Sequence, residues 1–305
     1  MAPLIKIILT IVGVGVGAAL LSPPIYCLIQ VGTEICPWLA SIPFHRVFSR
    51  LLLICFLLAM GPLLIALRIS NFKELGLQKN SRWACDFSWG LLMGLLPMTF
   101  LMMAYVYFDV CGVRDHQIEL TSVLRVAGTA VGVSILEELL FRGLLYGLSR
   151  RTFGAFFSAL WTSAFFAIVH FIRSAGPSAH PLDAWSGFRE CGRIFSAAPP
   201  PLTLAFGLAS LFFISLLLCW TVERTHSLAL PIGLHVGWIF AIQTINLLIG
   251  FRLKAPGVLP WVGPNVVSGM VPIGIFAILA ICTTFLLCGQ YLHGRARKIS
   301  ATKCA

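Results

Sequence analysis

The stretch Leu136-Glu137-Glu138-Leu139-Leu140-Phe141-Arg142-Gly143 puts two adjacent carboxylates and one guanidinium inside the apolar run of residues 131–148. A charged side chain at mid-bilayer depth costs about 2.5–3.5 kcal/mol on insertion scales, so such residues usually have a function. Glu138 and Arg142 are four residues apart, share one helix face and can form an ion pair. Glu137 points about 100° away on the same helix and has no local partner. Burial without a cation suits Glu137 to act as a general base near neutral pH.

The composition around this stretch is that of a membrane protein. Of 305 residues, 58% are hydrophobic and 11% are charged, with a mean hydropathy of +0.92, whereas soluble domains carry about 25% charged residues. The net charge of +11 fits loops that orient membrane helices and contact anionic lipid, so no nucleic-acid partner is expected. The ten cysteines form no CxxC pair, which argues against a thiolate zinc site.

Apolar segments of about 20 residues are long enough to span a bilayer. They predict an all-α polytopic membrane protein with about eight transmembrane helices and a catalytic core in the middle-to-late helices. The expected spans are residues 7–21, 50–69, 87–108, 120–148, 153–172, 202–222, 228–249 and 271–292. The first is expected to be an uncleaved span, because no cleavage site precedes Pro23-Pro24. Basic connectors place both termini on the cytoplasmic side.

Two histidines join the charged stretch as candidate site residues. They are His170, in Phe166-Ala167-Ile168-Val169-His170, and His235, in Gly233-Leu234-His235-Val236-Gly237-Trp238. A single buried histidine is usually structural. One carboxylate and two imidazoles from three neighbouring helices, however, could activate a water, bind a metal or relay protons.

The depths of these residues do not agree when counted from the expected turns. At 1.5 Å per residue, Glu138 lies about 18–20 Å from the turn at Arg150-Arg151, and His170 about 28 Å from it. His235 lies about 12 Å from the turn at residues 225–227 by the same count. Convergence therefore requires tilted or kinked helices, or spans with other boundaries. Bends are possible at Gly128, Gly132, Pro231 and Gly233.

The pattern Glu137-Glu138-x-x-x-Arg142, then Phe166-x-x-x-His170, then His235 in a Gly-Leu-His-x-x-Trp context resembles the CAAX protease and bacteriocin-processing family. These proteins, also called the Abi or type II CAAX protease group, are intramembrane endopeptidases. The resemblance covers about residues 134–240. It implies N-terminal transmembrane helices at 1–119, a protease core at 120–250, and a loop, last helix and basic tail at 251–305.

The resemblance also implies a mechanism for peptide-bond hydrolysis. Glu137 and His170 would orient and deprotonate a water, His235 would help to stabilise the oxyanion, and Glu138 would pair with Arg142. The catalytic residues expected on this basis are Glu137, Glu138, His170 and His235. The expected supporting residues are Arg142, Phe166 and Trp238.

Ile239 departs from the family pattern, which usually has Asn or Asp four residues after the third-motif histidine. Trp238 offers an indole N–H instead, and its replacement by Phe should then lower turnover about 10²–10³-fold; packing alone is the competing reading. No obligatory metal is expected. If a divalent metal such as zinc is bound, its ligands would be Glu137, His170 and His235.

Two other functions stay open at this stage. Ile239 is compatible with a catalytically inactive family member that acts as a binding or immunity protein. Intramembrane Glu and His also occur in proton-coupled transporters, although the sequence has no internal repeat. The expected partners of the enzyme are the lipid bilayer and a membrane-associated protein or peptide substrate, and the expected location is the cell (plasma) membrane.

Overall fold

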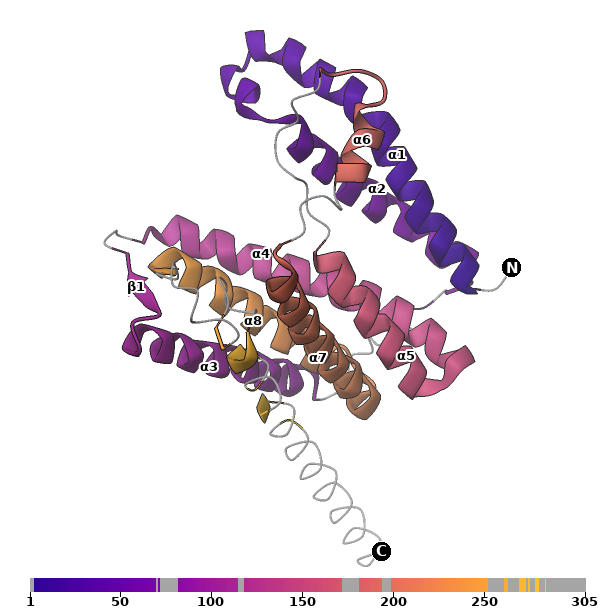
Figure 1. The fold of residues 1–305 in the computed structure, drawn as a ribbon. Coiled ribbons are helices and arrows are strands. Elements are labelled where there is room, and N and C mark those ends of the chain that lie inside the picture. Colours follow the sequence, from indigo (N-terminus) through magenta and orange to yellow (C-terminus); the bar gives the residue numbers. More distant parts are fainter. Residues whose placement is uncertain are drawn as a thin grey trace, which may run out of the picture. The chain divides into compact units, whose positions relative to one another are not determined.

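The computed structural model describes residues 3–69, 71, 82–114, 118–171, 181–193 and 199–251, with 261–262, 269–272, 274, 278–279 and 283. The described chain is almost entirely helical, which confirms the predicted all-α class (Figure 1). Its longer elements are α1 (Pro3–Val31), α2 (Phe44–Ala66), α3 (Trp83–Tyr107), α4 (Leu120–Glu138), the π-helical η4 (Leu139–Tyr146), α5 (Gly147–His170), α6 (Ser186–Arg193), α7 (Pro201–Thr225) and α8 (Ala229–Leu248). Its shorter ones are the 3₁₀ helices η1 (Gly32–Glu34) and η2 (Pro37–Ser41) and the strands β1 (Cys111–Val113) and β2 (Ile249–Phe251).

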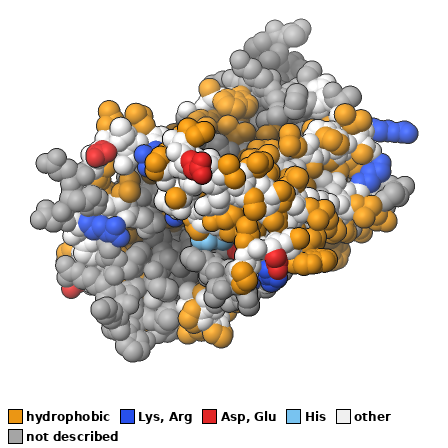
Figure 2. Space-filling model, turned by 90° about the horizontal axis from the view of Figure 1, so that it is seen from above, with side chains coloured by type: hydrophobic (Ala, Val, Ile, Leu, Met, Phe, Trp, Pro, Cys, Tyr) orange, Lys and Arg blue, Asp and Glu red, His pale blue; other side chains and the backbone are white. Residues whose placement is uncertain are grey.

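Six of the described helices are long and apolar enough to cross a membrane, and the chain is an integral membrane protein. Apolar side chains also predominate over charged ones among the described residues on the face drawn in Figure 2. The expected eight spans differ from these six for two reasons. The fourth and fifth fall within one helical run, Leu120–His170, and the eighth, residues 271–292, lies for the greater part outside the described residues.

The chain divides into two compact units. The first contains Met1–Phe72 and Ile168–Pro200, and the second contains Lys73–Ala167 and Pro201–Ala305. In the first unit α6 packs against α1, and a Cβ on Gly187 would lie 2.0 Å from the Ala19 carbonyl oxygen.

Helix α1 does not end before Pro23-Pro24 as expected, since it continues through both prolines to Val31. Likewise α2 begins at Phe44, earlier than the expected start at residue 50.

Helices α3 and α8 pack closely against each other in the second unit. A Cβ on Gly90 or Gly94 of α3 would lie 2.3 or 2.4 Å from a carbonyl oxygen of α8, and one on Gly233 or Gly237 of α8 would lie 2.2 or 2.7 Å from one of α3. Both helices thus carry a Gly-x-x-x-Gly motif, which lets helix backbones approach closely in membranes. This contact fixes the position of α8 and with it that of His235.

Gly154 reverses the helical run that carries the charged stretch. Its backbone angles, φ 74° and ψ 170°, are non-helical and lie in a region that glycine adopts without a steric penalty. The reversal therefore falls at Gly154 and not at Arg150-Arg151, as the sequence count had assumed. The strands β1 and β2 pair antiparallel and were not expected from the sequence.

Candidate active site

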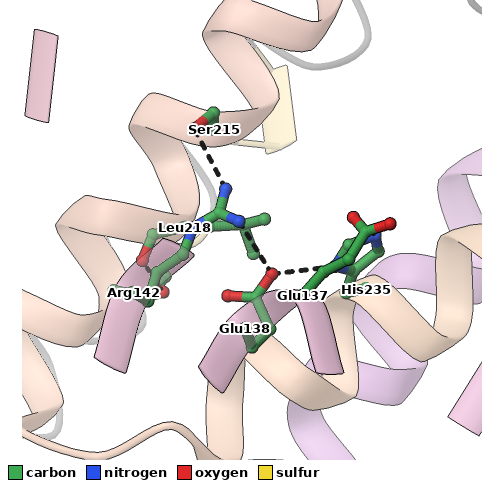
Figure 3. Close-up of polar contacts among 7 residues, drawn as sticks. Glu137, Glu138, Arg142, Ser215, Leu218 and His235 are labelled. Carbon is green, nitrogen blue, oxygen red and sulfur yellow. Dashed lines mark hydrogen bonds and ion pairs between the residues drawn. The ribbon is translucent and has the colours of Figure 1, made fainter. Parts of the chain in front are cut away.

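Glu138 and Arg142 form the buried ion pair that their spacing predicts. Arg142 Nη1 donates to Glu138 Oε1 at 3.0 Å, and neither side chain is exposed. Arg142 Nη2 donates to Ser215 Oγ of α7, also at 3.0 Å (Figure 3). The guanidinium thus links η4 to α7. Since a buried charge is tolerated only when it is paired and hydrogen-bonded, each of these contacts helps to hold the carboxylate in place.

His235 lies close to both glutamates, with Glu138 facing Nδ1 and Glu137 facing Nε2, and Figure 3 shows the contact with Glu138. His235 Nδ1 is 2.8 Å from Glu138 Oε1, and His235 Nε2 is 3.7 Å from Glu137 Oε2. An ionised carboxylate only accepts hydrogen bonds, so Nδ1 carries the proton of the shorter contact. Glu138 therefore sets the orientation of the imidazole and holds a proton on Nδ1. The sequence had left Glu137 without a local partner, and its partner comes instead from α8.

The two carboxylates differ in their access to solvent. The side chain of Glu137 is 23% exposed, whereas that of Glu138 is 0% exposed. One glutamate is therefore committed to the buried arginine, and the other lies at the edge of the cluster. This is the division of roles that the helix geometry of adjacent residues predicts.

Aromatic rings close the other side of the cluster. The guanidinium carbon of Arg142 lies 4.5 Å from the ring centroid of Phe166, within the range of a cation–π contact. The Phe166 ring also lies 6.2 Å from the His235 ring and 4.9 Å from that of Phe141. The Phe of the second motif thus contacts both the arginine of the first and the histidine of the third.

The backbone that carries Arg142 is π-helical from Leu139 to Tyr146. Such segments are rare and frequently occur at functional sites. At its far end the Tyr146 hydroxyl donates to Glu223 Oε2 at 2.8 Å, and Arg150 Nη2 lies 3.0 Å from Glu223 Oε1. These contacts join the C-terminal end of α7 to the π-helical segment.

The roles of the remaining expected site residues stay predictions. His170 is the last residue of α5, is half-buried, and belongs to the first unit, so its participation stays a prediction. Trp238 is buried in the apolar core with Met98, Leu218 and Leu234, and a role as an oxyanion donor also stays a prediction. Ile239 packs with the apolar cluster around Ala130 and Val236.

Sequence reasoning missed two serines. Ser215 contacts Arg142 although it is 73 residues away in the sequence. Ser134 is fully buried one turn before Glu138. The sequence signal for both residues was a hydroxyl within an apolar helix. Many other serines of the chain share this signal, so it does not single out these two.

The cluster contains side chains of the types that bind metal ions. Within the described part of the chain, no group of three or more His, Cys, Asp or Glu side chains is arranged to hold one. Glu138 Oε1 already accepts from both Arg142 and His235. The metal ligands suggested by the sequence, Glu137, His170 and His235, stay a prediction.

Comparison with protein families gives a match that spans this cluster. Residues 119–241 match the family described as type II CAAX prenyl endopeptidase Rce1-like. The resemblance to the CAAX protease and bacteriocin-processing family is thereby confirmed over this segment, which contains all three motifs. The matched family is a family of membrane-embedded proteases. Comparisons with curated proteins and with solved structures gave no match.

Proposed function

We propose that this chain is an intramembrane endopeptidase that hydrolyses a peptide bond of a membrane-associated protein or peptide. The observation that carries the proposal is the position of His235 between two carboxylates, of which Glu138 is neutralised by Arg142. This arrangement supplies one carboxylate near solvent and one oriented imidazole. Because the matched family is described as prenyl endopeptidases, a substrate attached to the bilayer fits the proposal, and the cell membrane is the proposed location.

The proposed reaction uses Glu137 as general base. Its carboxylate takes a proton from water, and the hydroxyl adds to the carbonyl carbon as the carbonyl π electrons move to oxygen. His235 stabilises this oxyanion by donation from Nε2, because Nδ1–H already bonds to Glu138, and the step therefore uses an imidazole with a proton on each ring nitrogen. The C–N bond then breaks, and the leaving amine receives the proton from Glu137, as general acid–base catalysis requires.

His170 is proposed to help Glu137 to orient the water. The hairpin around Gly154 supports this role. Arg142 and Phe166 each lie twelve residues from Gly154 and are in contact. His170 follows Phe166 by one turn of α5, and Phe166 contacts both Arg142 and His235.

The decisive experiment compares peptide cleavage by the purified wild type and the Glu137→Gln variant. Glutamine keeps the shape of the side chain and cannot accept the proton, so the cleavage rate should fall about 10²–10⁴-fold. Glu34→Gln, at an exposed position of η1 in the first unit, is the matched control and should retain full activity. Cleavage by Glu137→Gln at the wild-type rate would refute the proposed base.

We propose further that no metal is obligatory, because one glutamate and two histidines suffice for general-base catalysis. A chelator should leave cleavage unchanged. Loss of activity on chelation, followed by its recovery on addition of zinc, would contradict this.

A second candidate is a catalytically inactive member that binds a membrane partner. Ile239 favours it, because an apolar side chain packed with Ala130 and Val236 replaces the usual hydrogen-bonding residue. Absence of cleavage by the wild type across a peptide library, together with partner capture unaffected by Glu137→Gln, would support this candidate.

A further inference from the structure

Ser134 is a fully buried hydroxyl one helical turn from both glutamates. It lies three residues before Glu137 and four before Glu138, a spacing that puts side chains about 5–6 Å apart on a helix surface. Among the described residues its Oγ has no hydrogen-bond partner. In the same helical run the hydroxyls of Thr129 and Ser149 donate to the carbonyl four residues earlier, whereas those of Ser158 and Thr162, like that of Ser134, have no partner among the described residues. A buried donor without a partner is uncommon and requires an explanation.

The buried stripe of α4 that contains Ser134 faces α8. Its last member, Glu138, contacts His235 on α8. The two helices run antiparallel, because β1 precedes α4, β2 follows α8, and these strands pair with each other. Because the helices are antiparallel and Glu138 faces His235, the residue four before Glu138 faces the residue four after His235. These two residues are Ser134 and Ile239. The residue across from the hydroxyl is therefore apolar and cannot satisfy it.

We propose that Ser134 donates its hydroxyl hydrogen bond to the oxyanion of the tetrahedral intermediate, as a further catalytic residue. This inference rests on the proposed function and adds a donor to it. No bond to Ser134 forms or breaks. The hydroxyl stabilises the negative oxygen that appears when water adds to the carbonyl, and this donor supplements His235 on the side where α8 carries Ile239.

The first arm of the experiment measures kcat and KM for Ser134→Ala. A donor that bonds the oxyanion acts in the transition state alone, so kcat should fall about 10–10³-fold with KM unchanged. Ser158→Ala removes another fully buried hydroxyl that has no partner in the described part of the chain. Ser158 lies four residues after the Gly154 reversal, and this control should keep the wild-type kcat.

The second arm asks whether a donor can be returned from the facing helix. Ile239→Asn in the Ser134→Ala background puts an amide at the level of the lost hydroxyl and should recover at least tenfold of the lost kcat. Ile239→Leu in the same background adds no donor and should recover nothing. Equal recovery by Asn and Leu, or an unchanged kcat in Ser134→Ala, would overturn the inference.

The third arm separates the inference from the proposed function. A hydroxyl that is unsatisfied in the free protein contributes nothing to folding, so Ser134→Ala should keep or raise the Tm in detergent. A lowered Tm would mean that the hydroxyl is bonded within the fold, and the inference would fail whether or not the chain is a protease. Wild-type protein that cleaves no peptide, with the Tm of Ser134→Ala raised, would instead refute the proposed function and with it the oxyanion role.

Discussion

Replacement of Arg142 by methionine tests whether the buried ion pair holds the site together. The change removes the 3.0 Å contact with Glu138, the 3.0 Å hydrogen bond to Ser215 and the cation–π contact with Phe166. Removing one partner of a buried pair costs about 3–5 kcal/mol, because the other charge is left uncompensated. Hydrogen bonds between membrane helices average about 0.6 kcal/mol. Most of the decrease in the free energy of unfolding should therefore come from the charge left uncompensated on Glu138. Ser215→Ala alone should lower the free energy of unfolding by less than about 1 kcal/mol.

The assay is a double-mutant cycle on the free energy of unfolding, measured by titration of the micelle-embedded protein with SDS. Arg142→Met should be far less destabilising in a Glu138→Gln background, where no uncompensated carboxylate is left, so the two changes should be non-additive by at least about 2 kcal/mol. Additive values would refute the view that the pair acts as a unit. Arg189→Met serves as control, because Arg189 and Asp183 form an exposed pair, and surface pairs contribute little.

Two further predictions concern helix contact and thiol chemistry. Gly233→Ala would put a Cβ 2.2 Å from the Phe87 carbonyl oxygen, so α3 and α8 would have to separate. The yield of folded protein, measured by size-exclusion chromatography, should therefore drop sharply. The control Gly128→Ala, where a Cβ would meet nothing within 4 Å, should leave that yield unchanged. Burial raises the pKa of the Cys111 thiol to about 11, so below that pH its thiolate fraction is small and rises about tenfold per pH unit. Alkylation of Cys111 followed by mass spectrometry should be slow at pH 8, should accelerate steadily up to pH 10, and should be much slower than that of the more accessible Cys36; equal rates for the two thiols would contradict this.

The sequence predicted the contacts that depend on a single helix. Glu138 and Arg142 pair because residues four apart share a helix face whatever the surrounding fold. The contacts made across helices were not predictable in this way. His235 meets Glu138 across 97 residues, and Ser215 meets Arg142 across 73, and no periodicity specifies which face of α7 or α8 turns toward α4. The motif resemblance identified His235, but no pattern identified Ser215.

The mismatch in depth arose from the assumption that the turns lie at one level. The first turn is at Gly154, later than assumed. The second turn, at residues 225–227, is level with the π-helical segment instead, because Glu223 at the end of α7 bonds to Tyr146. Tyr146 lies eight residues from Glu138, and Ser227 lies eight residues from His235. Counted from these levels, both side chains reach the same depth, and straight helices suffice for them to meet.

The adjacency of the two glutamates has a physical explanation in the shape of imidazole. Adjacent helical residues diverge by about 100°, and a ring with two nitrogens can engage both carboxylates at once, as His235 does. Glu138 and Arg142 cancel in charge, and the second nitrogen of the same imidazole faces Glu137. A buried charge is tolerated only when it is paired and hydrogen-bonded. A base at Glu137, as proposed above, therefore requires both the arginine, which neutralises the neighbouring glutamate, and the histidine, which lies beside it.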